Sequence, residues 1–137
     1  MKFVRFSVNS EEKYGIIDSE SVKEITNSPI GNSYKETGEI FEIKSIKILA
    51  PNPNPGKMLC LALNYESHLL GADKPSRPEP FYKNSNAIIG PGDTIMLPKD
   101  AGLVVCESEL VAIIGKQAKN VSEENALDYV FGYTCGN

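Results

Sequence analysis

Alternation of apolar and polar residues dominates the first part of the chain. Residues 2–8 alternate, 14–18 have the pattern of a hairpin partner, and 22–25 continue that pattern. Successive side chains of a strand point to opposite faces, so this spacing predicts half-buried strands. Another strand is expected over 41–49, where one register slip breaks the alternation. Residues 26–39 are rich in Asn, Ser, Gly and Pro and predict a loop.

A proline-rich segment then divides the chain. Residues 51–56 contain three prolines, which resist both helix and central strand and favour a stiff, extended connector. The sequence therefore predicts a small N-terminal β module over residues 1–50, a linker over 51–56, and a main domain over 57–137.

The second part is more apolar and combines short strands with turns. A short helix is expected over 122–129, with Ser122 as its N-cap and Glu123 and Glu124 at the positive end of its dipole. Residues 66–72 fit a short helix or a loop, and 74–80 a proline-rich surface loop. Residues 57–63 predict a strand covered on both faces. Residues 88–97 predict two strands, one on either side of the Gly90-Pro91-Gly92 turn. Strands are also expected over 104–114 and from residue 130. The fold class expected is mainly β with few short helices (α+β).

Composition and charge exclude several classes of protein. The 137 residues hold 14 Lys and Arg against 18 Asp and Glu, a net charge of −4, so no basic face is available for nucleic acid. No apolar run approaches the about 20 residues that a membrane-spanning helix needs. The N-terminus lacks the apolar block of a signal peptide. The three cysteines, Cys60, Cys106 and Cys135, are widely spaced and are expected to be buried thiols of a cytoplasmic protein.

Glu107 and Glu109 are the most informative pair of acidic residues. In a strand, residues i and i+2 point to the same face about 6.6 Å apart. Apolar residues flank the pair on both sides, which predicts a strand buried on both faces. Buried neighbouring carboxylates are costly to ionise unless a cation such as Mg²⁺ compensates. An edge strand with solvated acids fits the same pattern, and both interpretations stay open.

Two further side chains are candidates for chemistry. His68 is the only histidine, and its imidazole is a candidate general base because it titrates near neutrality; an ordinary surface or core histidine is the alternative. Lys83 follows two aromatic residues and either extends its ammonium from the end of an apolar strand or binds an anionic substrate.

A series of ordered segments carries a resemblance to a known family. These segments are Asn64-Tyr65-Glu66-Ser67-His68, Pro80-Phe81-Tyr82-Lys83, Ile89-Gly90-Pro91-Gly92-Asp93, Glu107-Ser108-Glu109-Leu110, Ile114-Gly115-Lys116, Asn120-Val121-Ser122-Glu123-Glu124 and Ala126-Leu127-Asp128-Tyr129-Val130-Phe131-Gly132-Tyr133. From residue 57 onward the chain resembles the fumarylacetoacetate hydrolase family. The region before the linker resembles the small N-terminal module that many members carry.

The resemblance implies a mixed β roll and a metal-dependent enzyme. Members use Mg²⁺ or a similar ion, such as Mn²⁺, in hydrolysis, decarboxylation or tautomerisation of keto-enol dicarboxylic or acylpyruvate-type acids of aromatic or amino-acid catabolism. Glu107 and Glu109 match two of three carboxylate ligands. His68 matches the histidine that activates water or shuttles a proton, and Tyr65 and Lys83 match substrate-binding positions.

Two departures from the family pattern affect the expected activity. Gly71 stands where many hydrolytic members have a glutamate that pairs with the histidine, which favours isomerase or decarboxylase over hydrolase. The third carboxylate ligand is expected one residue after Asn137, so the chain is expected to stop inside the catalytic domain and to bind its metal weakly. The alternative to an enzyme is therefore a truncated, inactive or split-enzyme fragment. Its apolar strand from Val130 would then require a homo-oligomer or a partner chain.

Overall fold

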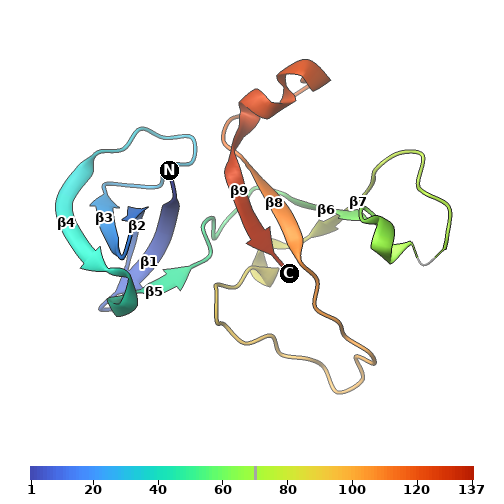
Figure 1. Ribbon diagram of the computed structural model, residues 1–137, viewed down its shortest axis with the longest axis horizontal. Helices are drawn as coiled ribbons and strands as arrows, with labels where there is room; N and C mark the ends of the chain where they lie inside the picture. Colours follow the sequence, from blue (N-terminus) through green and yellow to red (C-terminus); the bar gives the residue numbers. More distant parts are fainter. Residues whose placement is uncertain (70) are drawn as a thin grey trace.

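The structure is a computed structural model that describes residues 1–69 and 71–137, and it confirms the mainly β fold class. Its strands form one five-stranded sheet and two separate two-stranded sheets (Figure 1). All of the strand pairs are antiparallel. None of the helices within the described residues is long and apolar enough to cross a membrane.

The five-stranded sheet is built from the first fifty residues and has the order β4-β3-β2-β1-β5. Its core is the apolar cluster of Val4, Phe6 and Val22, of which Phe6 and Val22 are fully buried. Asn9 and Ser10 both adopt positive φ angles and form the tight turn that a two-residue hairpin requires. The strands are β1 (Phe3–Val8), β2 (Glu11–Asp18), β3 (Ser21–Ile25), β4 (Glu36–Glu42) and β5 (Lys47–Leu49).

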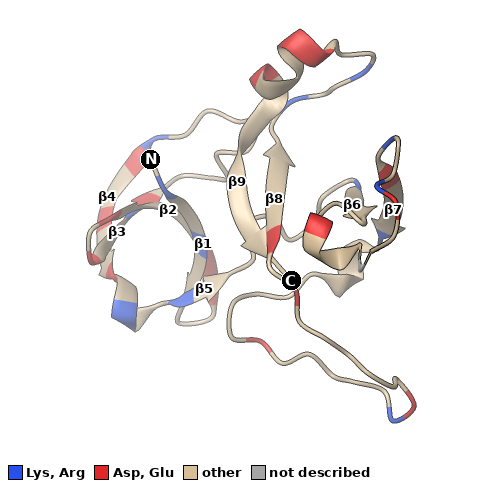
Figure 2. Cartoon of the chain, turned by 45° about the vertical axis from the view of Figure 1, so that its right-hand side comes forward, with Lys and Arg blue, Asp and Glu red and all other residues tan. Residues whose placement is uncertain are grey.

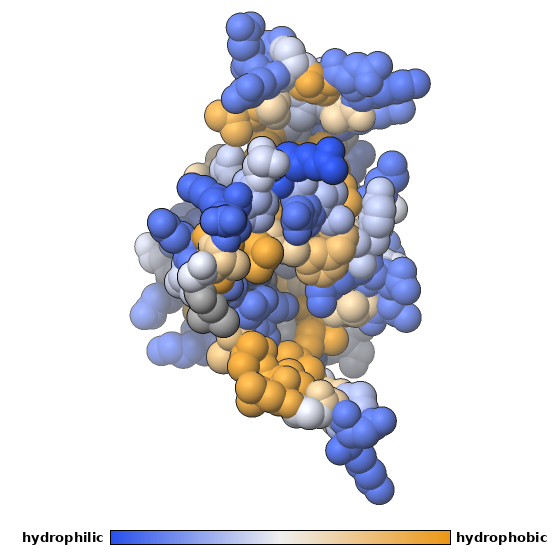
Figure 3. All heavy atoms as spheres, turned by 90° about the vertical axis from the view of Figure 1, so that its right-hand side faces the viewer, coloured by the Kyte–Doolittle hydropathy of each residue, from blue (hydrophilic) through white to orange (hydrophobic). Residues whose placement is uncertain are grey.

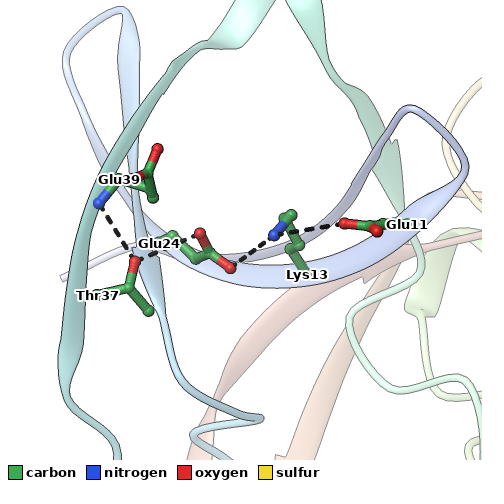
Figure 4. A network of polar contacts seen from close by, with 5 residues as sticks. All are labelled: Glu11, Lys13, Glu24, Thr37 and Glu39. Carbon is green, nitrogen blue, oxygen red and sulfur yellow. Dashed lines mark hydrogen bonds and ion pairs between the residues drawn. The ribbon is translucent and has the colours of Figure 1, made fainter.

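A polar network links β2, β3 and β4 (Figure 4). The Lys13 ammonium lies 2.9 Å from Glu24 Oε1 and 3.8 Å from Glu11 Oε2. Its hydrogen bond to Glu24 raises the pKa of Lys13 above the ordinary value. Thr37 Oγ1 donates to Glu24 Oε2 at 3.3 Å and accepts the Glu39 N–H at 3.2 Å. The network therefore continues to the edge strand β4.

The predicted boundaries were wrong at the end of this sheet. The single strand expected over 41–49 is divided, because η1 (Ile43–Ser45) separates β4 from β5. The Ile43 N–H donates to the Glu20 carbonyl at 2.9 Å, outside the strand ladder. The loop expected over 26–39 ends earlier, at Lys35, since the polar residues from Glu36 onward can form an exposed edge strand.

The second part contains two hairpin-like sheets and short 3₁₀ turns. The strand β6 (Met58–Ala62) pairs with β7 (Glu79–Lys83), and β8 (Glu109–Ile114) pairs with β9 (Val130–Gly136). The 3₁₀ elements are η2 (Glu66–His68), η3 (Ser85–Ala87) and η4 (Glu123–Tyr129). The predicted helix over 122–129 is therefore a 3₁₀ segment, and its N-cap Ser122 makes no side-chain capping bond.

Several apolar runs of the second part do not form the predicted strands. Residues 88–97 contain the turn at Gly92, with φ of 80°, but no strand. The strand expected over 104–114 begins only at Glu109. The strand expected to be covered on both faces, β6, leaves Leu59 54% and Leu61 42% exposed. For β6 and β8 the physical reason is that each belongs to a sheet of only two strands, so no third strand covers it within the described residues.

The cysteine prediction was partly wrong. All three thiols are free, as expected, but Cys106 and Cys135 are exposed and Cys60 is half-buried. Cys135 lies in β9, and Cys106 precedes β8, on the same uncovered part of the fold. The expectation of burial failed because it assumed that every apolar run lies in a core.

The N-terminal sheet packs against the second part through aromatic and polar contacts. The Phe3 ring lies 5.4 Å from that of Phe131 at the start of β9. Lys47 Nζ binds Asp93 Oδ1 at 2.8 Å, while Asp93 Oδ2 accepts the Gly90 N–H at 2.8 Å. These two hydrogen bonds, with Lys47 contributing more, lower the pKa of Asp93. The turn at Gly90 is thereby held against β5.

Candidate active site

The structure brings the predicted base and one predicted metal ligand together. His68 Nδ1 lies 3.5 Å from Glu107 Oε1, although the two residues come from separate parts of the chain. Their side chains are 47% and 45% exposed. An exposed pair of this kind contributes little to folding stability. Its importance is therefore positional: it places an imidazole beside a carboxylate on an accessible surface.

The short turn η2 positions His68. The His68 N–H donates to the Tyr65 carbonyl at 3.0 Å, and the Leu69 N–H donates to the Glu66 carbonyl at 3.1 Å. The preceding Leu63 has a positive φ of 51°, which turns the chain sharply after β6. The imidazole is thus carried on a compact turn at the end of a strand.

Tyr65 connects this turn to β8. Its ring centroid lies 6.1 Å from that of His68. Its hydroxyl oxygen accepts the Leu110 N–H at 3.5 Å, a long hydrogen bond. The candidate substrate-binding tyrosine therefore lies beside the candidate base and next to the strand that begins with Glu109.

The two carboxylates have different structural settings. Glu109 is the first residue of β8 and pairs with Gly136, whereas Glu107 precedes the strand. The Glu107 N–H donates to Asn137 Oδ1 at 2.7 Å. Sequence reasoning missed Asn137, because no sequence signal indicates which backbone group its amide would meet.

Of the two interpretations that the sequence leaves open, a strand buried on both faces does not describe the surroundings of these carboxylates. Leu110, which follows the pair, is 68% exposed, and Glu107 is itself 45% exposed. Burial therefore gives no reason for a compensating cation here. The alternative of solvated acids at the edge of a sheet describes this geometry, although solvated carboxylates also bind divalent ions.

Lys83 is remote from this cluster along the β6–β7 ladder. It pairs with Met58, whereas Ala62, next to the segment that carries His68, pairs with Glu79. Four residues along a strand correspond to about 13 Å. Lys83 instead lines a shallow cavity of about 560 Å³ together with Lys57 and small polar residues. Its role in substrate binding stays a prediction.

The donor set is of the right kind for a divalent ion but is small. Within residues 1–69 and 71–137, no group of three or more His, Cys, Asp and Glu side chains lies close enough to hold a metal ion. Glu107 and Glu109 supply carboxylate oxygens, the ligand type that Mg²⁺ prefers together with water. Figure 2 shows acidic positions at the start of β8, close to the C-terminal end of β9. The pair could therefore supply part of an octahedral oxygen shell.

The fold and these residues define a class of β-rich protein in which a histidine lies beside one carboxylate and a second carboxylate begins β8. Residues 57–137 match the family described as "Fumarylacetoacetate (FAA) hydrolase C-terminal", and residues 1–51 match "Rv2993c-like, N-terminal". The chain belongs to the fumarylacetoacetate hydrolase family, as the sequence motifs predicted.

Curated relatives match over most of this chain but only part of their own length. The "Fumarylacetoacetate hydrolase domain-containing protein 2 homolog" of Dictyostelium discoideum is 52% identical over 97 residues, which cover 69% of this chain and 32% of the relative. A mitochondrial oxaloacetate tautomerase of Xenopus laevis is 42% identical over 100 residues, 72% of this chain and 31% of the relative. The chain thus spans about a third of the length of these relatives.

Solved structures share the fold over nearly the whole chain. The 5-carboxymethyl-2-hydroxymuconate delta-isomerase of Mycobacterium smegmatis has a TM-score of 0.86 and 32% identity over 99% of this chain and 54% of its own. Maleylpyruvate hydrolase of Sphingobium sp. SYK-6, in complex with manganese(II) and pyruvate, has a TM-score of 0.75 and 25% identity over 98% of this chain and 57% of its own. The chain therefore spans about half of each of these structures.

Proposed function

We propose that this chain carries part of the active site of a divalent-metal-dependent isomerase that acts on keto-enol dicarboxylic acids. The observation that carries the proposal is the approach of His68 Nδ1 to Glu107 Oε1 at 3.5 Å. Relatives named as a tautomerase and an isomerase support isomerisation, and a hydrolase structure that contains manganese and pyruvate supports the divalent ion.

Each carboxylate has a defined task in this proposal. Glu107 turns Oε1 toward His68, which leaves Oε2 free for a cation that Glu109 would also bind. Mg²⁺ or Mn²⁺ held there would polarise the keto or enolate oxygen of the substrate. The negative charge of Glu107 also orients the imidazole, so that Nε2 is the nitrogen available for proton transfer.

His68 moves one proton in the proposed isomerisation. Its Nε2 accepts a proton from the enol oxygen or from the carbon beside the carbonyl, and returns it to another carbon of the same conjugated system. No bond to water forms and the oxidation state does not change. Tyr65, beside His68, is the candidate to contact the substrate, and the role of Lys83 in binding a distal carboxylate rests on the family resemblance.

The residue at position 71 favours isomerisation over hydrolysis. Gly71 has a positive φ of 90°, and a Cβ there would meet nothing within 4 Å. Because glycine has no side chain, position 71 supplies no carboxylate to pair with His68 and activate water. An imidazole without that partner can still shuttle a proton between substrate atoms.

Product analysis in D₂O tests this proposal. We expect a hydroxy-diene dioate incubated with the protein and Mg²⁺ to give an isomer of the same composition, with deuterium at the newly protonated carbon, by ¹H NMR. Acylpyruvate is the matched substrate for cleavage, and we expect it to stay uncleaved. Release of pyruvate from acylpyruvate would contradict the isomerase and favour a hydrolase.

The exposed apolar surface supports a second part of the proposal, a homo-oligomer or a partner chain. Leu103 is 92% exposed, Tyr82 71% and Leu110 68%. Figure 3 shows apolar side chains gathered in a patch on the face of the molecule that it presents. Exposed apolar patches of this kind mark interaction surfaces. Sedimentation velocity is expected to show an assembly larger than a monomer, and a stable monomer would count against this second part.

A further inference from the structure

The N-terminal sheet and the second part of the chain meet at separate points. Among residues 1–69 and 71–137, no strand of that sheet makes an extensive contact with a strand of the second part. One point is the pair of rings of Phe3 and Phe131, and another is the close approach of Gly31, whose added Cβ would lie 2.8 Å from the Gly115 carbonyl oxygen. Two modules joined by a small interface move against one another unless specific contacts hold them.

The turn of residues 90–93 provides a further contact and is closed by its own hydrogen bonds. Pro91 and Gly92, the latter with a φ of 80°, occupy the central positions that a type II turn favours for these residue types. The Asp93 N–H donates to the Gly90 carbonyl at 3.1 Å, and the Gly90 N–H donates to Asp93 Oδ2 at 2.8 Å. The Asp93 carboxylate is therefore part of the turn, while its other oxygen, Oδ1, is available to a partner.

That partner comes from the N-terminal sheet. Lys47 Nζ, from β5, lies 2.8 Å from Asp93 Oδ1. A Cβ built on Gly90 would lie 3.3 Å from Ala50 N and 3.4 Å from Leu49 Cα, so the backbone of the turn lies directly against the end of β5. The side chains of Lys47 and Asp93 are 58% and 32% exposed. Water and salt reach the ion pair, and its strength therefore depends on ionic strength.

We propose that Asp93 is a charge-dependent latch, through which Lys47 of the N-terminal sheet keeps the turn at Gly90 closed. One carboxylate makes both bonds, so contact with the sheet and closure of the turn are coupled. When the ion pair opens, the carboxylate regains rotamer freedom and the Gly90 N–H loses a fixed acceptor. The latch contains no residue of the candidate active site and is independent of metal binding.

Amide hydrogen exchange at Gly90 in the full chain, followed by NMR at low and at high NaCl concentration, tests the latch. Lys47→Met removes the cation and leaves the sequence of the turn unchanged. Asp93→Asn keeps an oxygen that can accept the Gly90 N–H but removes the negative charge. Lys44→Met is the matched control, because Lys44 is exposed, lies in the neighbouring η1 and forms no ion pair with the described residues.

We expect Lys47→Met to speed exchange at Gly90 about twofold to fivefold at low salt, the effect of one exposed ion pair. High salt should speed exchange in the unaltered protein and in Lys44→Met. It should leave Lys47→Met almost unchanged, because the pair that salt screens is already absent. Asp93→Asn should speed exchange at least as much as Lys47→Met.

The double variant Lys47→Met, Asp93→Asn should exchange no faster than Asp93→Asn alone, because both changes remove the same interaction. Unchanged exchange at Gly90 in Lys47→Met would overturn the latch. Additive effects in the double variant, or an equal salt dependence in Lys47→Met and the unaltered protein, would overturn it as well.

Discussion

Replacement of His68 by alanine is expected to lower Mg²⁺-dependent turnover by about 100-fold or more, the contribution typical of a positioned acid or base. The physical reason is that His68 is the only histidine and that its Nδ1 faces Glu107, which leaves Nε2 to move the substrate proton. The measurement is the rate of loss of keto-enol absorbance at saturating Mg²⁺, with folding checked by circular dichroism.

Ser67→Ala is the matched control for this variant. Ser67 lies in the same turn, η2, and its side chain makes no hydrogen bond to the described residues. Its turnover should stay within about twofold, since surface substitutions of this kind change little. Equal rates for His68→Ala and Ser67→Ala would show that His68 moves no proton.

Replacement of both candidate ligands by glutamine is expected to abolish the effect of Mg²⁺ on thermal stability. An ion that binds only the folded state adds about 2.7 kcal/mol at 100 times its dissociation constant. The Glu107→Gln, Glu109→Gln double variant keeps the size of both side chains but loses the charges that bind the ion. Differential scanning calorimetry with increasing Mg²⁺ should therefore show a rising Tm in the unaltered protein and a constant Tm in the variant.

The first turn of η4 offers a control with the same change in charge. Glu123 and Glu124 are acidic and exposed, and no metal-ligand role is assigned to them. The Glu123→Gln, Glu124→Gln double variant should keep the full Mg²⁺ response. If the ligand variant also kept it, Glu107 and Glu109 would not be the ligands.

Local pattern predicted the N-terminal sheet well. The alternation over 2–8 and 14–18 corresponds to β1 and β2, because each strand buries one face and pairs through a tight turn. The later apolar runs behaved differently: β8 begins at Glu109 although the apolar run begins earlier, at Leu103. A strand requires a hydrogen-bonding neighbour as well as apolar residues, and composition does not identify that neighbour.

The candidate site was predictable in its residue types but not in its contacts. The motifs around His68 and Glu107 indicated both residues, but only the structure places them 3.5 Å apart. The hydrogen bond between Asn137 and Glu107 depends on the register of β8 and β9 and on the close approach at Gly136. Such contacts depend on tertiary arrangement, which no single segment encodes.

The most direct test of a metal-dependent keto-enol isomerase is a turnover measurement on the unaltered protein, with Mg²⁺ and again with chelator. The substrates are a hydroxy-diene dioate, oxaloacetate and an acylpyruvate, each followed by its keto-enol absorbance. The site built from His68, Glu107 and Glu109 predicts turnover of at least one dicarboxylic acid with Mg²⁺ and its loss in chelator. Turnover that persists in chelator, or no turnover of any substrate, would contradict it.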